Sequence, residues 1–206
     1  MDSTLIAQEC LDELASLAGC GEEVAAITEA AMRGDLGFEG ALAERVALLR
    51  GQPTNLLDRT LAERITLTPG ADVMARTLRA AGTRLVLVSG GFTVFTGAIA
   101  ARLGFDAHHG NRLETAEGRL TGRTVPPVLG RAAKAERLAA ERAALALRPE
   151  QTCALGDGAN DLDMLRATPL GIAYHAKPVV ADAAPLRLDH ADLSAVPALF
   201  GLPPAA

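Results

Sequence analysis

The chain has 206 residues, of which 49% are hydrophobic and 22% charged, so it can bury a core as one domain with an insertion or as two small domains. Its 20 basic and 25 acidic residues give a net charge of −5, which creates no broad attractive field for a polyanion. Aromatic residues make up only 3%, so the side chains that stack on nucleic-acid bases are scarce as well. We therefore expect no nucleic-acid partner.

The cysteines and the apolar runs indicate the compartment. Cys10, Cys20 and Cys153 are odd in number and lack CxxC spacing, and Cys153 lies in an apolar run, where cysteine behaves as a small core residue. The chain begins with an acidic segment, and no apolar run approaches the length that crosses a membrane. We expect a cytoplasmic protein with no membrane partner, either a monomer or a homodimer.

Apolar residues have helical spacing almost throughout residues 6–65. Short breaks at 19–21, 34–37 and 51–53 divide this segment into three or four helices, and such short connections are typical of a compact bundle. The pattern predicts a helical domain at residues 7–66, inserted into a second domain made of residues 1–6 and 67–206.

Strands and helices alternate after residue 66. The predicted strands are 84–88, 152–155, 170–174 and a possible one at 186–188, with a hairpin within 111–123. The predicted helices are 70–81, 130–147, 178–183 and 193–200. This alternation predicts an α/β fold: a Rossmann-like parallel sheet with helices on both faces and a ligand site at the carboxyl ends of the strands. The inserted helical domain would cover that site as a cap.

Polar side chains gather at the predicted strand ends. In the stretch 156–161, Asp157 directly follows a strand and can give Mg²⁺ the oxygen ligand that this ion prefers. The alternative is an ordinary Asn/Asp helix cap. The segments 2–4 and 89–91 reach the same sheet edge. Ser89, followed by two glycines at a helix start, suits a phosphate, although such a sequence is also an ordinary turn.

Lys134 is expected in the first turn of a helix. The helix dipole disfavours a cation there, so a nearby anionic ligand would explain this lysine, whereas the alternative is a solvated surface residue. Arg45 projects from an apolar helical face without an acidic residue three or four positions away. It could bind an anion or could extend to solvent as a snorkelling side chain.

Four motifs together resemble a known family. MDSTLIAQE at 1–9, SGGF at 89–92, Lys134 and GDGANDLDML at 156–165 occur in the order and approximate spacing of the haloacid-dehalogenase superfamily. The chain is most similar to the phosphoserine phosphatases of that superfamily. The segment EVAAITEAAMRGDLGFEGALAERVALL at 23–49 resembles their cap, so the resemblance covers nearly the whole chain.

The resemblance implies Mg²⁺-dependent hydrolysis of O-phosphoserine to serine and phosphate, the last step of serine biosynthesis. It implies catalytic roles for Asp2, Ser89 and Lys134, with Asp2 exchanging a proton with the leaving oxygen and the other two holding phosphoryl oxygens. It implies a metal site of Asp2, through its carbonyl, with Asp157 and Asp161. The substrate-binding residues that it implies are Glu9 for the ammonium, Arg45 for the carboxylate, Met32 and Phe38 as pocket walls, and Ser89, Gly90 and Asn160.

The first motif of that superfamily is matched only in part. It reads D-x-D-x-T, and its first aspartate attacks phosphorus to form an aspartyl-phosphate. Asp2 matches the second aspartate and Met1 stands at the position between them, so the nucleophile and the apolar strand before it are absent from the 206 residues. We therefore expect the chain as written to be inactive, and we hypothesise that the reading frame extends upstream through a short apolar strand ending in Asp.

Two other functions fit the same residues. One is a related phosphatase for another small phosphorylated amine or acid. The other is a noncatalytic phosphoserine-binding protein, which applies if Met1 is the true start.

Overall fold

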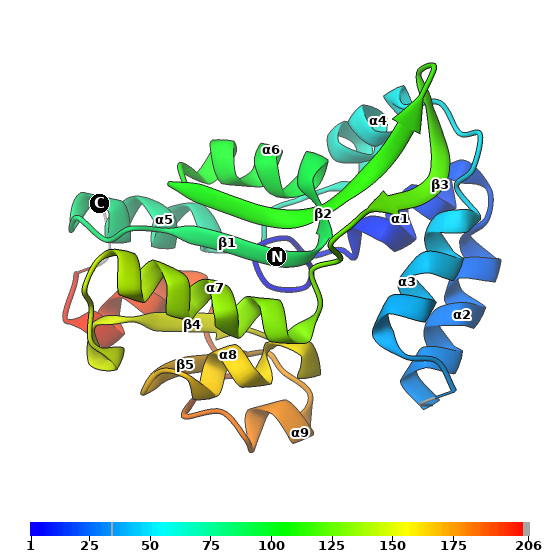
Figure 1. Cartoon of the computed structure of the whole chain (residues 1–206). Coiled ribbons are helices and arrows are strands. Elements are labelled where there is room, and N and C mark those ends of the chain that lie inside the picture. Colours follow the sequence, from blue (N-terminus) through cyan, green and yellow to red (C-terminus); the bar gives the residue numbers. More distant parts are fainter. Residues whose placement is uncertain (34, 204–206) are drawn as a thin grey trace.

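The computed structural model describes residues 1–33 and 35–203, without the side chain of Met32. Figure 1 shows helices packed around two layers of strands, with a group of helices set to one side. In chain order the helices are α1 (Cys10–Ala18), α2 (Gly21–Arg33), α3 (Phe38–Ala47), α4 (Asn55–Arg64), α5 (Ala71–Ala80), α6 (Thr93–Leu103), α7 (Arg131–Ala144), η1 (Pro149–Gln151), η2 (Ala159–Asp161), α8 (Leu162–Arg166), α9 (Pro178–Ala181) and η3 (Leu193–Phe200). The strands are β1 (Val86–Phe92), β2 (Ala107–Ala116), β3 (Arg119–Val125), β4 (Cys153–Gly156), β5 (Leu170–Tyr174) and β6 (Leu186–Leu188).

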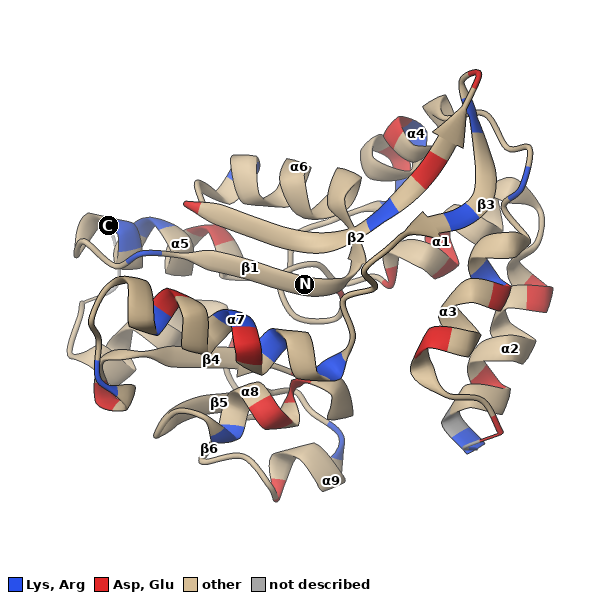
Figure 2. Cartoon of the chain, in the orientation of Figure 1, with Lys and Arg blue, Asp and Glu red and all other residues tan. Residues whose placement is uncertain are grey.

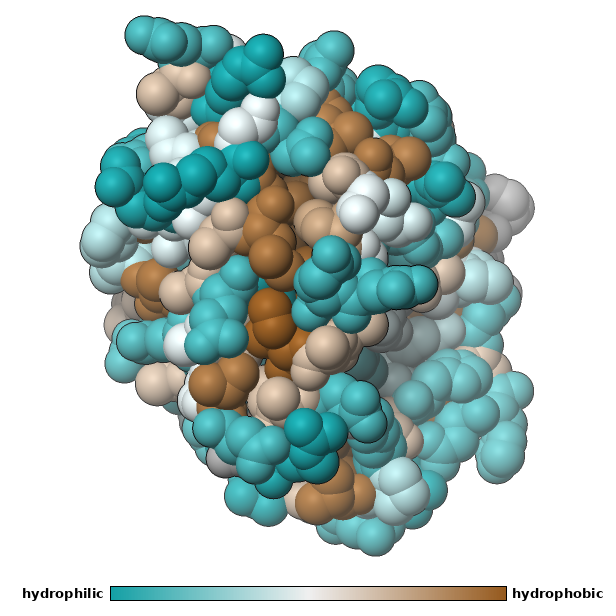
Figure 3. Space-filling model, turned by 90° about the vertical axis from the view of Figure 1, so that its right-hand side faces the viewer, coloured by the Kyte–Doolittle hydropathy of each residue, from teal (hydrophilic) through white to brown (hydrophobic). Residues whose placement is uncertain are grey.

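Helices α1 to α4 come from the segment with helical apolar spacing. Leu14 of α1, Val24 of α2 and Val46 of α3 are fully or almost fully buried, so the apolar positions face inward as their spacing predicts. Gly19 ends α1 in the left-handed conformation, at a φ of 81°, which glycine adopts without strain. The hairpin of β2 and β3 packs on α3, so these helices lie beside the strand layers (Figure 1). On this side of the molecule, hydrophobic residues form a band between hydrophilic ones (Figure 3).

The strands form two sheets and not the single parallel sheet that the sequence predicts. One sheet has the order β1-β2-β3 and the other the order β4-β5-β6. β1 and β2 are parallel, as are all three strands of the second sheet, whereas β2 and β3 form the antiparallel hairpin. Each of β1 and β4 thus pairs on one side only within the described residues. Figure 2 shows that neither strand carries a charged residue, whereas α7 beside them carries several.

The first six residues fold back tightly between the sheets. The carbonyl oxygen of Met1 accepts hydrogen bonds from the amides of Thr4, Leu5 and Ile6, at 2.8–3.2 Å. Ser3 adopts a φ of 53°, the left-handed region that non-glycine residues rarely enter. Met1 is buried, with 8% of its surface exposed. This turn brings the side chains of residues 2 and 4 to the carboxyl ends of β1 and β4.

The described residues contain no helix that is both long and apolar enough to cross a membrane. The three cysteines are free thiols, and burial raises the pKa of Cys153 to about 12, so it is a neutral packing residue at physiological pH.

Gly171 of β5 has backbone where a side chain would need to be. A Cβ there would overlap the carbonyl oxygen of Leu165 and lie 2.6 Å from its carbonyl carbon. Because both groups are backbone in regular elements, we expect Gly171→Ala to lower the free energy of unfolding by about 1–3 kcal/mol. Gly40→Ala is the matched control, since a Cβ at Gly40 of α3 meets nothing within 4 Å and alanine favours the helix. Urea denaturation of both variants measures this, and equal stabilities would contradict the predicted packing.

Candidate active site

A cavity of about 140 Å³ lies where the carboxyl ends of β1 and β4 meet the helical segment. It gathers side chains from five separate parts of the chain. Its lining residues are Met1, Asp2, Glu9, Cys10, Leu11, Phe38, Leu42, Arg45, Ser89, Gly90, Gly91, Phe92, Lys134, Asp157, Asn160 and Asp161. Every residue that the sequence singled out as catalytic, metal-binding or substrate-binding is among them except Met32, whose side chain lies outside the described part of the structure.

Asp2 is held at both carboxylate oxygens. Its Oδ1 accepts a hydrogen bond from the Cys10 amide at 3.0 Å, and its Oδ2 accepts one from the Ser89 hydroxyl at 3.2 Å. Gly91 donates its amide to the Ser89 hydroxyl at 2.9 Å. A Cβ on Gly91 would lie 3.0 Å from Asp2 Oδ2 and 3.2 Å from Ser89 Oγ, so a side chain there would require these groups to shift. A carboxylate fixed in this way is positioned for proton transfer at one point in the cavity.

Asp157 directly follows β4 and contacts the turn formed by residues 1–6. Its Oδ1 accepts a hydrogen bond of 2.5 Å from the Thr4 hydroxyl. Burial raises the pKa of Asp157 above its ordinary value, the Thr4 hydrogen bond lowers it, and the neighbouring Asp161 carboxylate raises it again. A cation beside this carboxylate would offset the burial cost of its charge.

Lys134 and Asp161 form a buried ion pair. The distance from Lys134 Nζ to Asp161 Oδ1 is 2.7 Å, and the two side chains are only 6% and 8% exposed. The other oxygen of Asp161 accepts hydrogen bonds from the amides of Asp157 and Gly158 at 3.3 and 3.1 Å. Lys134 is therefore not a solvated surface lysine: the anion beside it, near the start of α7, is this carboxylate.

The carboxylates differ in how well they suit a metal ion. No three Asp, Glu, His or Cys side chains in residues 1–33 and 35–203 are grouped as a metal site. Both oxygens of Asp161 are engaged by Lys134 and by backbone amides, so its carboxylate fits a supporting role better than direct ligation. Asp157 has one oxygen bound by Thr4, and the other has no hydrogen bond from any described group. Of the two, Asp157 fits a hard cation.

Arg45 of α3 contributes a positive charge to the cavity. Arg45 is partly buried, and among the described residues it donates hydrogen bonds only to the Ala41 carbonyl at 3.2 Å and the Thr28 hydroxyl at 3.4 Å. No acidic group of the described residues forms an ion pair with it, and desolvation lowers its pKa while Asp12 and Glu9 raise it. Such a guanidinium suits an anionic ligand group.

Glu9, Phe38 and Asn160 complete the wall of the cavity. Glu9 accepts a 2.6 Å hydrogen bond from Ser3, and desolvation raises its pKa against the effect of that bond. Phe38 reaches the main chain of β1, since a Cβ on Gly90 would lie 3.2 Å from the end of its ring. Asn160 folds over Gly158, and a Cβ on that glycine would overlap Asn160 Oδ1.

Sequence reasoning gave no role to two residues that position the site. Thr4 binds Asp157, and the signal for it was its match to the threonine of the D-x-D-x-T motif, to which no role was assigned. Asn111 is 1% exposed, donates to the Gly90 carbonyl at 2.8 Å and accepts from the Leu129 amide at 2.7 Å. It thereby ties the end of β1 to the loop before α7. A lone asparagine in a predicted hairpin carries no signal of this kind, because the contact joins distant segments.

Comparison with known proteins identifies the family of the chain. The family model of haloacid dehalogenase-like hydrolases matches residues 1–166. The chain belongs to that family. A phosphoserine phosphatase of Streptomyces coelicolor is 48% identical over 98% of the chain and 49% of its own length, and one of Archaeoglobus fulgidus is 43% identical over 98% and 59%. The chain thus spans about half the length of these curated relatives.

Two solved structures of phosphoserine phosphatases also match the chain. A phospho-aspartyl intermediate analogue of a phosphoserine phosphatase matches with a TM-score of 0.88 and 38% identity, covering 97% of this chain and 95% of that one. A substrate-bound phosphoserine phosphatase complex matches with a TM-score of 0.89 and 38% identity, covering 97% and 94%.

The buried ion pair of Lys134 and Asp161 should contribute to the stability of the fold. Replacing Lys134 by Met leaves the Asp161 carboxylate buried without its counter-charge, so Lys134→Met should lower the free energy of unfolding by about 3–5 kcal/mol. Arg59→Met is the control, because Arg59 pairs with Glu63 at 3.1 Å on the exposed face of α4, where such pairs contribute about 0.3–0.5 kcal/mol.

The double variant Lys134→Met, Asp161→Asn separates charge from packing. It removes both charges, so it should be more stable than Lys134→Met alone, as measured by urea denaturation. A Lys134→Met protein as stable as the Arg59→Met protein would contradict the buried pair.

Proposed function

We propose that this chain carries the site of a Mg²⁺-dependent phosphoserine phosphatase that hydrolyses O-phosphoserine to serine and phosphate. The observation that carries the proposal is the convergence of Asp2, Ser89, Lys134 and Asp157 with the half-buried Arg45 in one cavity of about 140 Å³. Supporting it, the relatives that match nearly the whole chain are phosphoserine phosphatases. We propose further that residues 7–66 form the cap over a core of residues 1–6 and 67–206, and that the protein acts in the cytoplasm.

In the proposed reaction the phosphoryl group lies between Ser89 and Lys134. The Ser89 hydroxyl and the ammonium of Lys134 hold its oxygens, and the latter is kept in place by Asp161. Asp2, fixed by Cys10 and Ser89, gives a proton to the leaving serine oxygen and later takes one from water. The substrate's carboxylate and ammonium groups face Arg45 and Glu9.

The proposed Mg²⁺ would be held by the Asp157 carboxylate and the Asp2 carbonyl, with Asp161 and Asn160 arranging the surroundings. When bound, the ion supplies positive charge that stabilises the charge developing on the phosphoryl oxygens. The raised pKa of Asp157 and its oxygen without a protein hydrogen bond support this assignment.

The attacking carboxylate is proposed to belong to an aspartate joined directly to Met1. The 206 residues should bind O-phosphoserine without turnover. Adding an apolar strand that ends in Asp before Met1 should produce phosphate release that depends on Mg²⁺ and stops with EDTA, as measured by a phosphate assay. No Mg²⁺-dependent release from the extended protein would refute the proposed function.

The alternative functions differ in measurable ways. If the protein is a noncatalytic binder, calorimetry will detect O-phosphoserine binding by both the 206-residue and the extended protein, with no release from either. A sibling phosphatase would instead prefer another small phosphomonoester in the same assay.

Arg45 should determine selectivity for the carboxylate. In the extended protein, Arg45→Ala should lower kcat/KM for O-phosphoserine by about 10- to 100-fold, since it removes a charge-assisted hydrogen bond. Hydrolysis of phosphoethanolamine, which has no carboxylate, should change little. The control is Arg59→Ala, on the exposed face of α4. Unchanged selectivity in Arg45→Ala would favour the sibling phosphatase.

A further inference from the structure

The pairing of β1 with β2 is interrupted at the edge of the active site. It runs regularly up to Val88 of β1 and resumes only where Phe92 faces Asn111 of β2. Three residues of β1, 89–91, therefore stand opposite a single residue of β2. A strand with extra residues bulges, and such bulges redirect side chains next to functional sites. This bulge contains Ser89, which lines the cavity.

Two neighbouring residues of β2 accommodate the bulge. Gly110 supplies space, since a Cβ there would lie 3.0 Å from the Gly91 carbonyl oxygen. Asn111 supplies a hydrogen bond, which its Nδ2 donates to the Gly90 carbonyl at 2.8 Å. A carbonyl inside a bulge lies outside the regular ladder of the strands, so a side chain is needed to satisfy it. Asn111, only 1% exposed, has this role.

The hydrogen bond to Gly90 acts on the site through one peptide group. The Gly90 carbonyl and the Gly91 amide belong to the same planar unit, so fixing the carbonyl also fixes the direction of the N–H. That N–H donates to the Ser89 hydroxyl at 2.9 Å, and the hydroxyl donates to Asp2 Oδ2 at 3.2 Å. Successive hydrogen bonds also polarise one another. Asn111 therefore orients the Ser89 hydroxyl, and through it the Asp2 carboxylate.

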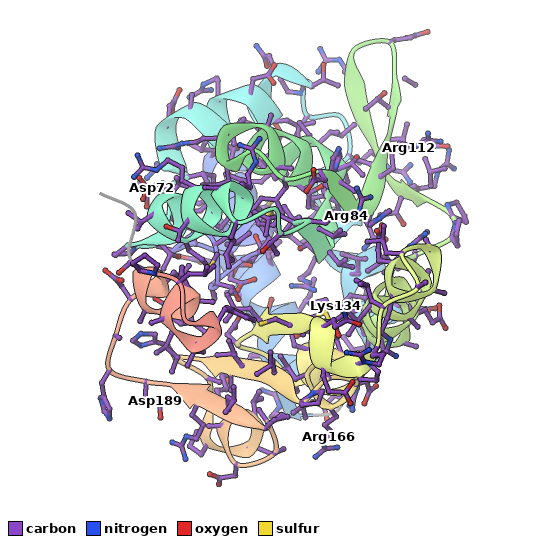
Figure 4. The ribbon with its side chains drawn as sticks, turned by 90° about the vertical axis from the view of Figure 1, so that its left-hand side faces the viewer. Asp72, Arg84, Arg112, Lys134, Arg166 and Asp189 are labelled. Carbon is purple, nitrogen blue, oxygen red and sulfur yellow. The ribbon has the colours of Figure 1, made fainter. Side chains whose placement is uncertain are left out.

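The same asparagine holds the segment before α7. Its Oδ1 accepts from the Leu129 amide at 2.7 Å, and its Nδ2 also contacts the Leu129 carbonyl at 3.4 Å. Leu129 is followed by Gly130, the residue before α7, and Lys134 lies in the first turn of that helix. Figure 4 shows Lys134 in the middle of the molecule, between the layer of β1 and the layer of β4, and Arg112, the residue after Asn111, at its margin. One side chain thus ties the bulge to the helix that carries Lys134.

Phe38 of α3 rests on both segments that Asn111 joins. A Cβ on Gly90 would lie 3.2 Å from Phe38 Cζ, and one on Gly130 would lie 3.8 Å from Phe38 Cδ1. The ring therefore lies against the main chain of β1 and of the start of α7. The relative position of these two segments sets where α3 meets the strand layers.

We propose that Asn111 is a positioning residue of the active site, which fixes the bulge of β1 against the start of α7 and thereby sets the direction of the Ser89 hydroxyl and the place of Lys134. Its use in the reaction rests on the proposed function, in which these two groups hold the phosphoryl oxygens. The hydrogen bonds themselves are independent of that function.

The test replaces Asn111 by a side chain of similar size that cannot form hydrogen bonds. In the 206-residue chain, Asn111→Leu should bind O-phosphoserine and inorganic phosphate at least about 10-fold more weakly by calorimetry. Without ligand, its Gly91 amide should exchange with solvent about 10-fold faster by NMR. Thr168→Val is the matched control and should change neither quantity. Thr168 is also buried and bonds the Thr152 carbonyl, and it is not among the described residues that line the cavity.

A double-mutant cycle with Ser89→Ala separates positioning from a general effect on stability. Because Asn111 acts through the Ser89 hydroxyl, Asn111→Leu should weaken binding less in the Ser89→Ala protein than in the unaltered chain. Losses that simply multiply would indicate a structural role and would overturn the proposal. Asn111→Ser, whose hydroxyl replaces only one pairing, should have a smaller effect of the same sign, and it carries the test if Asn111→Leu does not fold.

Unchanged exchange of the Gly91 amide in the Asn111 variants would also overturn the proposal, since the peptide group would then be held without the asparagine. This measurement needs no ligand. An unaltered chain that binds no O-phosphoserine would therefore contradict the proposed function alone, and the exchange rates would still decide whether Asn111 positions the bulge.

Discussion

Two hydroxyl–carboxylate hydrogen bonds join the halves of this protein through its first four residues. Asp2 accepts from Ser89 within β1, and Thr4 donates to Asp157, which directly follows β4. The turn closed on the Met1 carbonyl sets the spacing between Asp2 and Thr4, and the left-handed Ser3 lies between them. The site thus exists only while both sheets hold their positions, which makes packing between the layers a condition for the chemistry.

The sequence identified site residues where the residue type and the strand topology both indicate the same position. Ser89 and Asp157 were predictable because parallel strands bring their carboxyl ends to one edge, whichever strands lie between them. Lys134 was identified by its unfavourable place at a helix start, but its partner was not, because the Asp161 contact joins residues 27 positions apart in a fold not yet known. The partners of Thr4 and Asn111 were missed for the same reason, because both contacts join distant segments of the chain.

The number of sheets could not be predicted from strand patterns. Periodicity identifies a strand, whereas its pairing depends on which neighbour is present to supply hydrogen bonds. The apolar runs of β1 and β4 predicted strands, and residues of α5, α7 and η3 line the same cavity as these strands. Among the described residues the facing edges of β1 and β4 have no strand partner, so one expected sheet appears as two.

Gly91 has a consequence for how this site tolerates sequence change. A side chain at this position would crowd the Asp2 carboxylate and the Ser89 hydroxyl, both of which line the cavity. A substitution there would require these two groups to shift, and its Cβ would also lie 3.6 Å from Met1 Cε. Sequence change at this position is therefore limited by the side chains of the cavity, and its first effect would be on the placement of the Asp2 carboxylate.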